Sequence, residues 1–103
     1  MIKKRPIIEN DSEFKAILQR ALARTDQLAK LDPSFKLPSV IRPQLEFIGQ
    51  FLRENRVPSN DDRARVTIGV LAVRNFDDGD PEYSKWLKAL NYAFNHWEQV
   101  SRS

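Results

Sequence analysis

TIGVLAVRNFDDGDPE, residues 67–82, decides the fold of this chain, because it joins an apolar helical stretch to an acidic turn and then begins another helix. After Phe76, an Asp-Asp-Gly tripeptide ends the first element. Asp80 can cap the next helix, and Pro81 has the fixed φ angle that suits a first helical position. The stretch therefore predicts two helices joined by a short turn.

The segment before this turn, residues 60–76, fits two periodicities. It alternates as a strand would at Val66, Ile68 and Val70. It also keeps helical spacing at Ala64, Ile68, Leu71, Ala72 and Phe76. We predict one helix over 60–76, capped by Ser59 or Asn60, because no other stretch offers a strand for pairing. Gly69 inside it costs about 1 kcal/mol relative to alanine, which indicates a close helix crossing.

Three further helices are predicted. The first covers 10–30, with a capping box from Asn10 and Glu13 and an apolar face of Phe14, Ile17, Leu18, Ala21, Leu22 and Leu28. The second begins at Ser39 or Arg42, since Pro43 would remove a bond from a helix already under way, and ends near Asn55. The last runs from Pro81 to about Val100 and carries Tyr83, Trp86, Leu87, Leu90, Phe94 and Trp97.

Short connections make neighbouring helices antiparallel, so the fold class is all-α, a single-domain antiparallel bundle of about four helices. We expect the helical domain to span 10–100, with a flexible N-terminal segment at 1–9 and a frayed C-terminus at 101–103. The composition, 41% hydrophobic and 30% charged, is that of a globular protein. No apolar run approaches the roughly 20 residues of a membrane span, and none follows the basic N-terminus as in a secretory signal. We expect a cytoplasmic protein.

Residue types exclude several kinds of chemistry. The chain has no cysteine, which excludes disulfides, thiolate metal sites and a cysteine nucleophile. His96 is the only histidine, and Glu98, two positions on, points elsewhere on a helix, so we predict no histidine catalysis. The three glycines are isolated, so no phosphate-binding loop is present. We therefore expect no enzyme activity, no cofactor and no metal.

Charge is unevenly distributed along the chain, although the net charge is only +3. Basic groups gather at Lys3, Lys4 and Arg5 and again at Arg56, Arg63 and Arg65. An acidic cluster consists of Asp77, Asp78, Asp80 and Glu82. The cluster lacks the closing Glu of a 12-residue calcium loop, so it is either a solvated loop with a helix cap or a patch that recognises a basic partner.

Two other features admit two interpretations each. Arg56, Arg63, Arg65 and Arg74 could contact phosphates, but Asp61 and Asp62 would lie against the same backbone, which is more typical of a solvated face. Tyr92 lies off the main apolar stripe of its helix. It is either an exposed interface anchor or a sign that the helix is buried on more than one side.

The sequence resembles a known family. Within residues 67–82 the order Thr, Gly, Ala-Val, Phe-Asp and Asp-Pro-Glu, followed by Leu and Tyr on the next helix, is similar to that of the small helical immunity proteins of type VI secretion systems. Arg20-Ala21-Leu22 and the run QLEFI at 44–48 occur in similar order, so the resemblance covers roughly 14–95. It implies an all-helical antitoxin whose partner is an effector toxin. It further implies that this toxin is an NAD(P) glycohydrolase or another nucleotide-targeting enzyme.

We therefore expect a protein that binds its cognate effector toxin and blocks the active-site cleft, with carboxylates meeting basic groups there. The first candidates for these contacts are Asp77, Asp78, Asp80 and Glu82, and the second are Asp61 and Asp62. Contacts elsewhere would use Gln19, Arg24, Gln44, Gln50 and Arg53. A small helical nucleic-acid-binding or regulatory adaptor module is the alternative. We expect no nucleic-acid or membrane partner, and the sequence leaves open whether the free protein forms a homodimer.

Overall fold

A computed structural model describes residues 8–100 of the chain. Its elements are α1 (Asp11–Leu31), α2 (Leu37–Glu54), α3 (Asn60–Ala64), α4 (Ile68–Asn75), α5 (Pro81–Asn95) and a terminal 3-10 turn, η1 (Trp97–Gln99). The described part contains no strand, so the all-α prediction is confirmed. Four of the helices are eight residues or longer, and α3 is a helix of only five residues.

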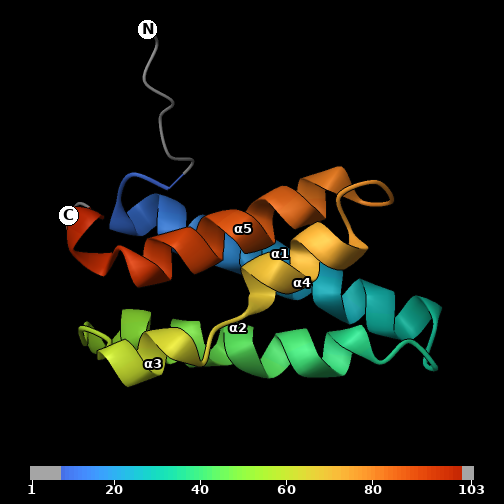
Figure 1. Ribbon diagram of the computed structural model, residues 1–103, viewed down its shortest axis with the longest axis horizontal. Helices are drawn as coiled ribbons and strands as arrows, with labels where there is room; N and C mark the ends of the chain where they lie inside the picture. Colours follow the sequence, from blue (N-terminus) through green and yellow to red (C-terminus); the bar gives the residue numbers. More distant parts are fainter. Residues whose placement is uncertain (1–7, 101–103) are drawn as a thin grey trace, which may run out of the picture.

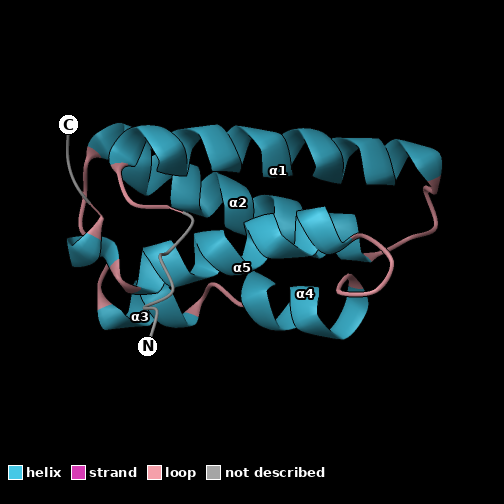
Figure 2. Cartoon of the chain, turned by 90° about the horizontal axis from the view of Figure 1, so that it is seen from above, coloured by secondary structure: helices cyan, strands magenta, loops and turns pink. Residues whose placement is uncertain are grey.

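The long helices form an antiparallel bundle around α1. α1 packs against both α2 and α5, and α4 packs against α5. Figure 1 shows that α2 and α5 both run opposite to α1. Figure 2 shows α4 on the far side of α5 from α1, at the outside of the molecule. The α4–α5 pair therefore forms one outer face of the bundle.

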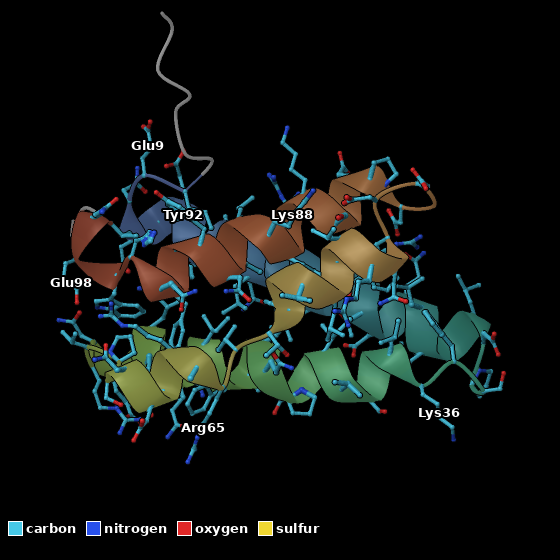
Figure 3. All side chains as sticks on the ribbon, in the orientation of Figure 1. Glu9, Lys36, Arg65, Lys88, Tyr92 and Glu98 are labelled. Carbon is cyan, nitrogen blue, oxygen red and sulfur yellow. The ribbon has the colours of Figure 1, made fainter. Side chains whose placement is uncertain are left out.

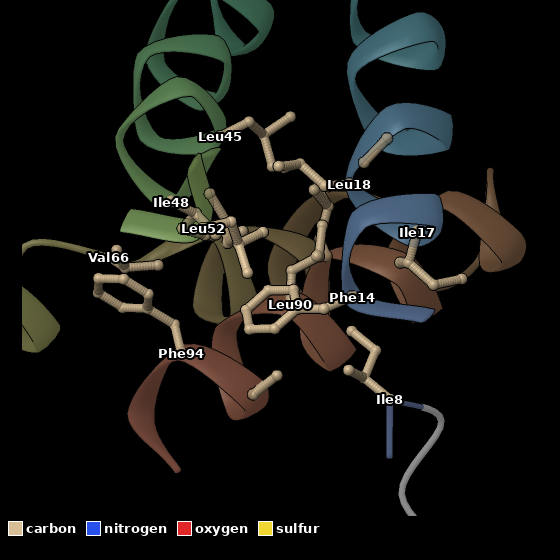
Figure 4. Close-up of a cluster of buried hydrophobic side chains, with 14 of the residues drawn as sticks. Ile8, Phe14, Ile17, Leu18, Leu45, Ile48, Leu52, Val66, Leu90 and Phe94 are labelled. Atoms are coloured by element: carbon tan, nitrogen blue, oxygen red, sulfur yellow. The ribbon is translucent and has the colours of Figure 1, made fainter. Parts of the chain in front are cut away.

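Aromatic rings join the bundle at one end. The Phe94 ring on α5 lies 5.3 Å from Phe51 and 5.9 Å from Phe47, both on α2, and 6.0 Å from Trp97. Trp97 in turn meets Phe14 of α1 at 5.7 Å. Figure 4 shows how Phe94, Phe14 and neighbouring aliphatic side chains converge from three helices. Edge-to-face contacts of this kind add to the free energy of burial.

The predicted cap of the first helix is present with one change. The Asn10 side chain accepts a hydrogen bond from Glu13 N at 2.9 Å, as expected of a helix cap. The Glu13 carboxylate, however, accepts from Glu9 N at 3.0 Å, one residue before the cap. Ile8 is already buried in the core. The remainder of the predicted N-terminal segment, 1–7, and the predicted frayed end, 101–103, lie outside the described residues.

The prediction of one continuous helix over 60–76 is wrong, because the chain leaves the helix between α3 and α4. Val66, in the break, is buried against the core. The next residue, Thr67, donates its backbone N–H to Gln44 Oε1 of α2 at 2.6 Å. The predicted cap at Ser59 is confirmed, and it forms a full capping box with Asp62.

Other helix ends also differ from the expected ones. α2 begins at Leu37, before the predicted Ser39, because Pro38 occupies an early position where no amide hydrogen is needed. Pro43 lies inside the helix rather than at its start. The predicted end near Asn55 is confirmed, with Asn55 in the left-handed conformation at φ 50°. α5 ends at Asn95 instead of continuing to Val100, and the 3-10 turn η1 follows it.

Within residues 8–100, no helix combines the length and the apolar character needed to cross a bilayer.

Candidate functional site

The acidic turn between α4 and α5 is anchored by Phe76. The Phe76 ring is buried, 4.9 Å from the Tyr83 ring and 6.1 Å from the Phe35 ring. Its carbonyl oxygen accepts a hydrogen bond from Asp80 N at 2.9 Å, which closes the turn. The four carboxylates of the turn therefore project from a well-fixed backbone.

The carboxylate of Asp77 is hydrogen-bonded to side chains of α5. Its Oδ1 accepts hydrogen bonds from the Ser84 hydroxyl and from Lys88 Nζ, the latter at 2.9 Å. The hydrogen bond from Ser84, followed by that from Lys88, lowers the pKa of the Asp77 carboxyl below its ordinary value. Ser84 is fully buried on α5. Asp77 therefore attaches the end of α4 to the first turns of α5.

Asp80 does not cap α5 with its side chain, which corrects the sequence prediction. The residue precedes Pro81 at the cap position, but its carboxylate makes no capping hydrogen bond. Instead, Asp80 Oδ2 accepts from Arg24 Nε of α1 at 2.8 Å. Both side chains are half-buried, so this ion pair connects α1 to the start of α5. The carboxylate of Asp80 therefore binds Arg24 of α1 in place of a backbone N–H at the start of α5.

A buried hydroxyl pair lies directly behind this ion pair. The Thr25 hydroxyl donates to Ala21 O at 2.7 Å, and the Tyr83 hydroxyl lies 2.6 Å from the same Thr25 oxygen. Because Thr25 has a single hydroxyl hydrogen, which Ala21 O accepts, Tyr83 is the donor in the second bond. Burial raises the pKa of the Tyr83 hydroxyl. The pair holds α1 against α5 and is part of the core.

Asp78 and Glu82 are the two carboxylates of the turn that face solvent without a partner. Both are exposed, and neither side chain makes a hydrogen bond or an ion pair with another residue in the described part of the chain. Of the four residues first predicted as contacts, two are therefore committed to the fold and two are free to meet another molecule.

The second predicted acidic pair divides in the same way. Asp62 Oδ2 accepts from Ser59 N at 2.9 Å, and this hydrogen bond is the main reason that the pKa of Asp62 is lowered. Asp61 beside it is exposed and free of such contacts within residues 8–100. Arg63, which follows Asp62, donates to Asn95 O at 2.8 Å and forms an ion pair with Glu98. This contact lowers the pKa of Glu98. α3 is thus held to the end of α5.

Figures 1 and 2 both place α3 and the acidic turn at opposite ends of the α4–α5 face. An open groove of about 700 Å³ runs along this face. It is lined by Arg63, Ala64, Val66, Thr67, Gly69, Val70, Val73, Arg74, Lys88, Asn91, Tyr92 and Asn95. The groove therefore lies on the same face as both predicted acidic sites.

Each interpretation of Tyr92 holds in part. α5 is buried on more than one side, because α1 and α4 both pack against it, but the Tyr92 side chain itself is 50% exposed. The ring packs edge-on against His96, with centroids 4.0 Å apart. Val70 and Val73 of α4 are exposed in the same groove, and sequence analysis did not select them as contacts. Their spacing of three residues on a short helix was the available signal.

Gly69 lies at a close crossing of α4 and α5, as predicted. A Cβ atom at this position would stand 3.2 Å from Asn91 Cβ. The Asn91 side chain accepts a hydrogen bond from Gly69 N at 2.9 Å, so α5 caps the first turn of α4 from outside that helix. Among the residues that the structure describes, no three His, Cys, Asp or Glu side chains form a metal-binding group. The site is therefore a protein surface built from two helices and a turn.

Comparisons with known proteins agree with this architecture. The family model described as Tsi6 matches residues 13–96. A relative named "Immune protein Tsi6", from Pseudomonas aeruginosa strain PAO1, is 35% identical over 80 residues, which is 74% of this chain and 80% of that protein. No solved structure matches. The chain thus belongs to a family of type VI secretion immunity proteins, as the resemblance implied. It belongs to the Tsi6 family.

Proposed function

We propose that this protein neutralises a cognate effector toxin by binding the toxin domain and covering its active-site cleft, and that it catalyses no reaction itself. The observation that carries the proposal is the family match, which extends over nearly the whole helical domain, residues 13–96. The structure supports it with a rigid helical surface. A pre-shaped surface favours tight binding because little conformational entropy is lost on association.

The proposed target is an enzyme that consumes NAD(P) or another nucleotide, as the family resemblance implies. Because these nucleotides are used in the cytoplasm, we propose that the protein meets its toxin there. An enzyme that turns over many times must be held almost completely bound. This requires a Kd of about 1 nM or lower, near −12 kcal/mol. An interface of roughly 1,600 Å² with a few well-placed anchors is sufficient for such an affinity.

We further propose that the acidic contacts to the toxin come from Asp78, Glu82 and Asp61. Their carboxylates are exposed and have no partner within the described residues. Asp77, Asp80 and Asp62 act indirectly, because their hydrogen bonds fix the turn and the start of α3. A basic rim around a nucleotide-binding cleft would complement these free carboxylates.

Co-expression tests this function. The toxin domain encoded beside this protein's gene is expressed with and without the protein. Surviving cells are counted, and the cellular concentration of NAD(P) is measured. We expect survival and a preserved NAD(P) pool only when the protein is present. Loss of another nucleotide from unprotected cells would correct the target alone. Absence of protection, together with no binding of the purified partners by calorimetry, would refute the function.

A charge-reversal pair tests the acidic contacts. We expect the double variant Asp78→Lys/Glu82→Lys to bind the toxin domain about 30-fold or more weakly, because two attractive contacts become repulsive. Glu54→Lys on α2 is the control, since Glu54 is exposed and pairs only at the surface with Arg56 and Gln50. Equal affinity of the double variant and the control would remove the acidic turn from the interface.

A further inference from the structure

The groove between α4 and α5 gathers apolar side chains that no part of the described chain covers. Six large apolar side chains are exposed among residues 8–100, and three of them line this groove: Val70, Val73 and Tyr92, exposed by 53%, 55% and 50%. The other three lie singly, Leu31 at the end of α1, Val40 on α2 and Val57 before α3. Scattered apolar residues are ordinary on a surface, whereas a group of them in a groove indicates a binding site.

All the charged residues that line the groove are basic. Its charged lining residues are Arg63, Arg74 and Lys88, and no Asp or Glu lines it. Arg63 is engaged by Asn95 O and Glu98, and Lys88 by Asp77. Arg74 is exposed and makes no ion pair or hydrogen bond with its side chain in the part of the chain that the structure describes. Its guanidinium therefore offers its donors to an incoming acceptor at the edge of an apolar patch.

The walls of the groove are fixed before any partner arrives. Asn91 accepts from Gly69 N, and Gln44 accepts from Thr67 N, so two neighbouring helices hold the start of α4. Tyr92 is supported by His96, the residue that directly follows α5. Figure 3 shows Tyr92 and Lys88 on the same side of α5. A partner therefore docks without first ordering this surface, which lowers the entropic cost of binding.

We infer that this groove receives an apolar segment of the effector toxin that carries a carboxylate. Apolar side chains of the segment lie on Val70, Val73 and Tyr92, and its Asp or Glu pairs with Arg74. The inference rests on the proposed function and adds to it a contact of opposite sign to the acidic turn. The toxin then meets α3, the groove and the turn as one continuous face, with free carboxylates at both ends and a free arginine between them.

The test is calorimetric titration of the full chain with the inactivated toxin domain encoded beside its gene. We expect Val73→Asp to raise the Kd about 30-fold or more, because a carboxylate enters the apolar patch. Val40→Asp is the matched control: it introduces the same change at an exposed valine on α2, and its Kd should remain that of the unaltered protein. Tyr92→Ala should weaken binding as well, whereas Tyr92→Phe should retain it.

Arg74 gives a readout that a loss of apolar contact alone would not produce. Arg74→Glu should raise the Kd about 30-fold or more and should weaken the salt dependence of the association rate. Substituting lysine for the partnering carboxylate of the toxin should restore binding to Arg74→Glu. Thermal unfolding of each variant checks that the fold is intact, as expected for exposed positions.

The outcomes separate the inference from the function on which it rests. If the unaltered protein binds the toxin and both Val73→Asp and Arg74→Glu bind equally well, the groove is not the contact and the proposed function stands. If the unaltered protein does not bind, both are refuted. If light scattering shows a dimer that Val73→Asp converts to a monomer, the occupant is a second copy of this chain, and the assignment to the toxin is overturned.

Discussion

Individual carboxylates in the acidic turn have different tasks because their nearest neighbours differ. Asp77 accepts hydrogen bonds from a buried serine and a lysine, and Asp80 pairs with an arginine of α1. The exposed side chain of Asp78 has no partner among the described residues. A hydrogen-bonded carboxylate stabilises the fold that positions it, whereas a free one can exchange water for a partner. The same residue type thus serves structure at one position and recognition at the next.

This difference predicts a pH dependence of stability. Hydrogen bonds from Ser84 and Lys88 depress the pKa of Asp77 in the folded state. Asp77 therefore contributes stability above its unfolded pKa of about 3.9, and this is lost as the pH falls through the folded value. Asp77→Asn should destabilise the protein at about pH 6, and the difference should shrink as the pH falls below about 4.

Urea unfolding at several pH values measures this effect. Asp78→Asn is the control, since its side chain has no partner to lose within residues 8–100. Asp62 and Glu98 also have lowered pKa values, so the Asp77→Asn variant should still lose some stability in acid. A difference between the native protein and Asp77→Asn that stays constant across this range would contradict the assignment.

At the scale of elements, α4 depends on its neighbours more than on its own sequence. It is a helix of eight residues whose cap residue, Thr67, makes no capping hydrogen bond with its side chain. Instead, Asn91 of α5 binds the N–H of Gly69 in the first turn, and Gln44 of α2 binds the N–H of the cap residue, Thr67. An isolated helix of this length is marginal in water, so the two amide side chains help to define where α4 begins.

A double-mutant cycle tests the crossing of α4 and α5. We expect Gly69→Ala to cost about 1–2 kcal/mol, because the new methyl group meets Asn91 at 3.2 Å and disturbs its hydrogen bond. In an Asn91→Ala background the cost should fall, because the contacts with Asn91 Cγ and Oδ1 are gone and only the contact with the Cβ atom remains. Urea denaturation gives the four free energies of unfolding. Strict additivity would show that the two residues do not interact.

For the whole molecule, the aromatic cluster around Phe94 couples three helices and the 3-10 turn. We expect Phe94→Ala to lower the free energy of unfolding by about 3–5 kcal/mol. The substitution removes a fully buried ring of α5 and with it the contacts of that ring with α2 and η1. Tyr92→Ala, two residues earlier on the same helix but exposed, should change it by about 0.5 kcal/mol or less. Similar losses for both would contradict the packing described.

Local signals in the sequence determined most of the helical framework. The apolar period of three and four residues, the caps at Asn10 and Ser59, and the stop and start around Pro81 act within one or two helical turns, so they can be recognised without the fold. The family resemblance, carried by the same stretches, led to the immunity class. The sequence also located the acidic turn and the close crossing at Gly69.

Only the tertiary structure decided which of these residues face a partner. The break at Val66 exists because that side chain is drawn into a core formed by other helices, which outweighs the local helical period. Asp80 is removed from the candidate contacts by Arg24, 56 residues away in sequence. The groove around Tyr92 arises where two helices meet. Such features depend on contacts between distant residues, which the packing of the whole chain creates and no local pattern contains.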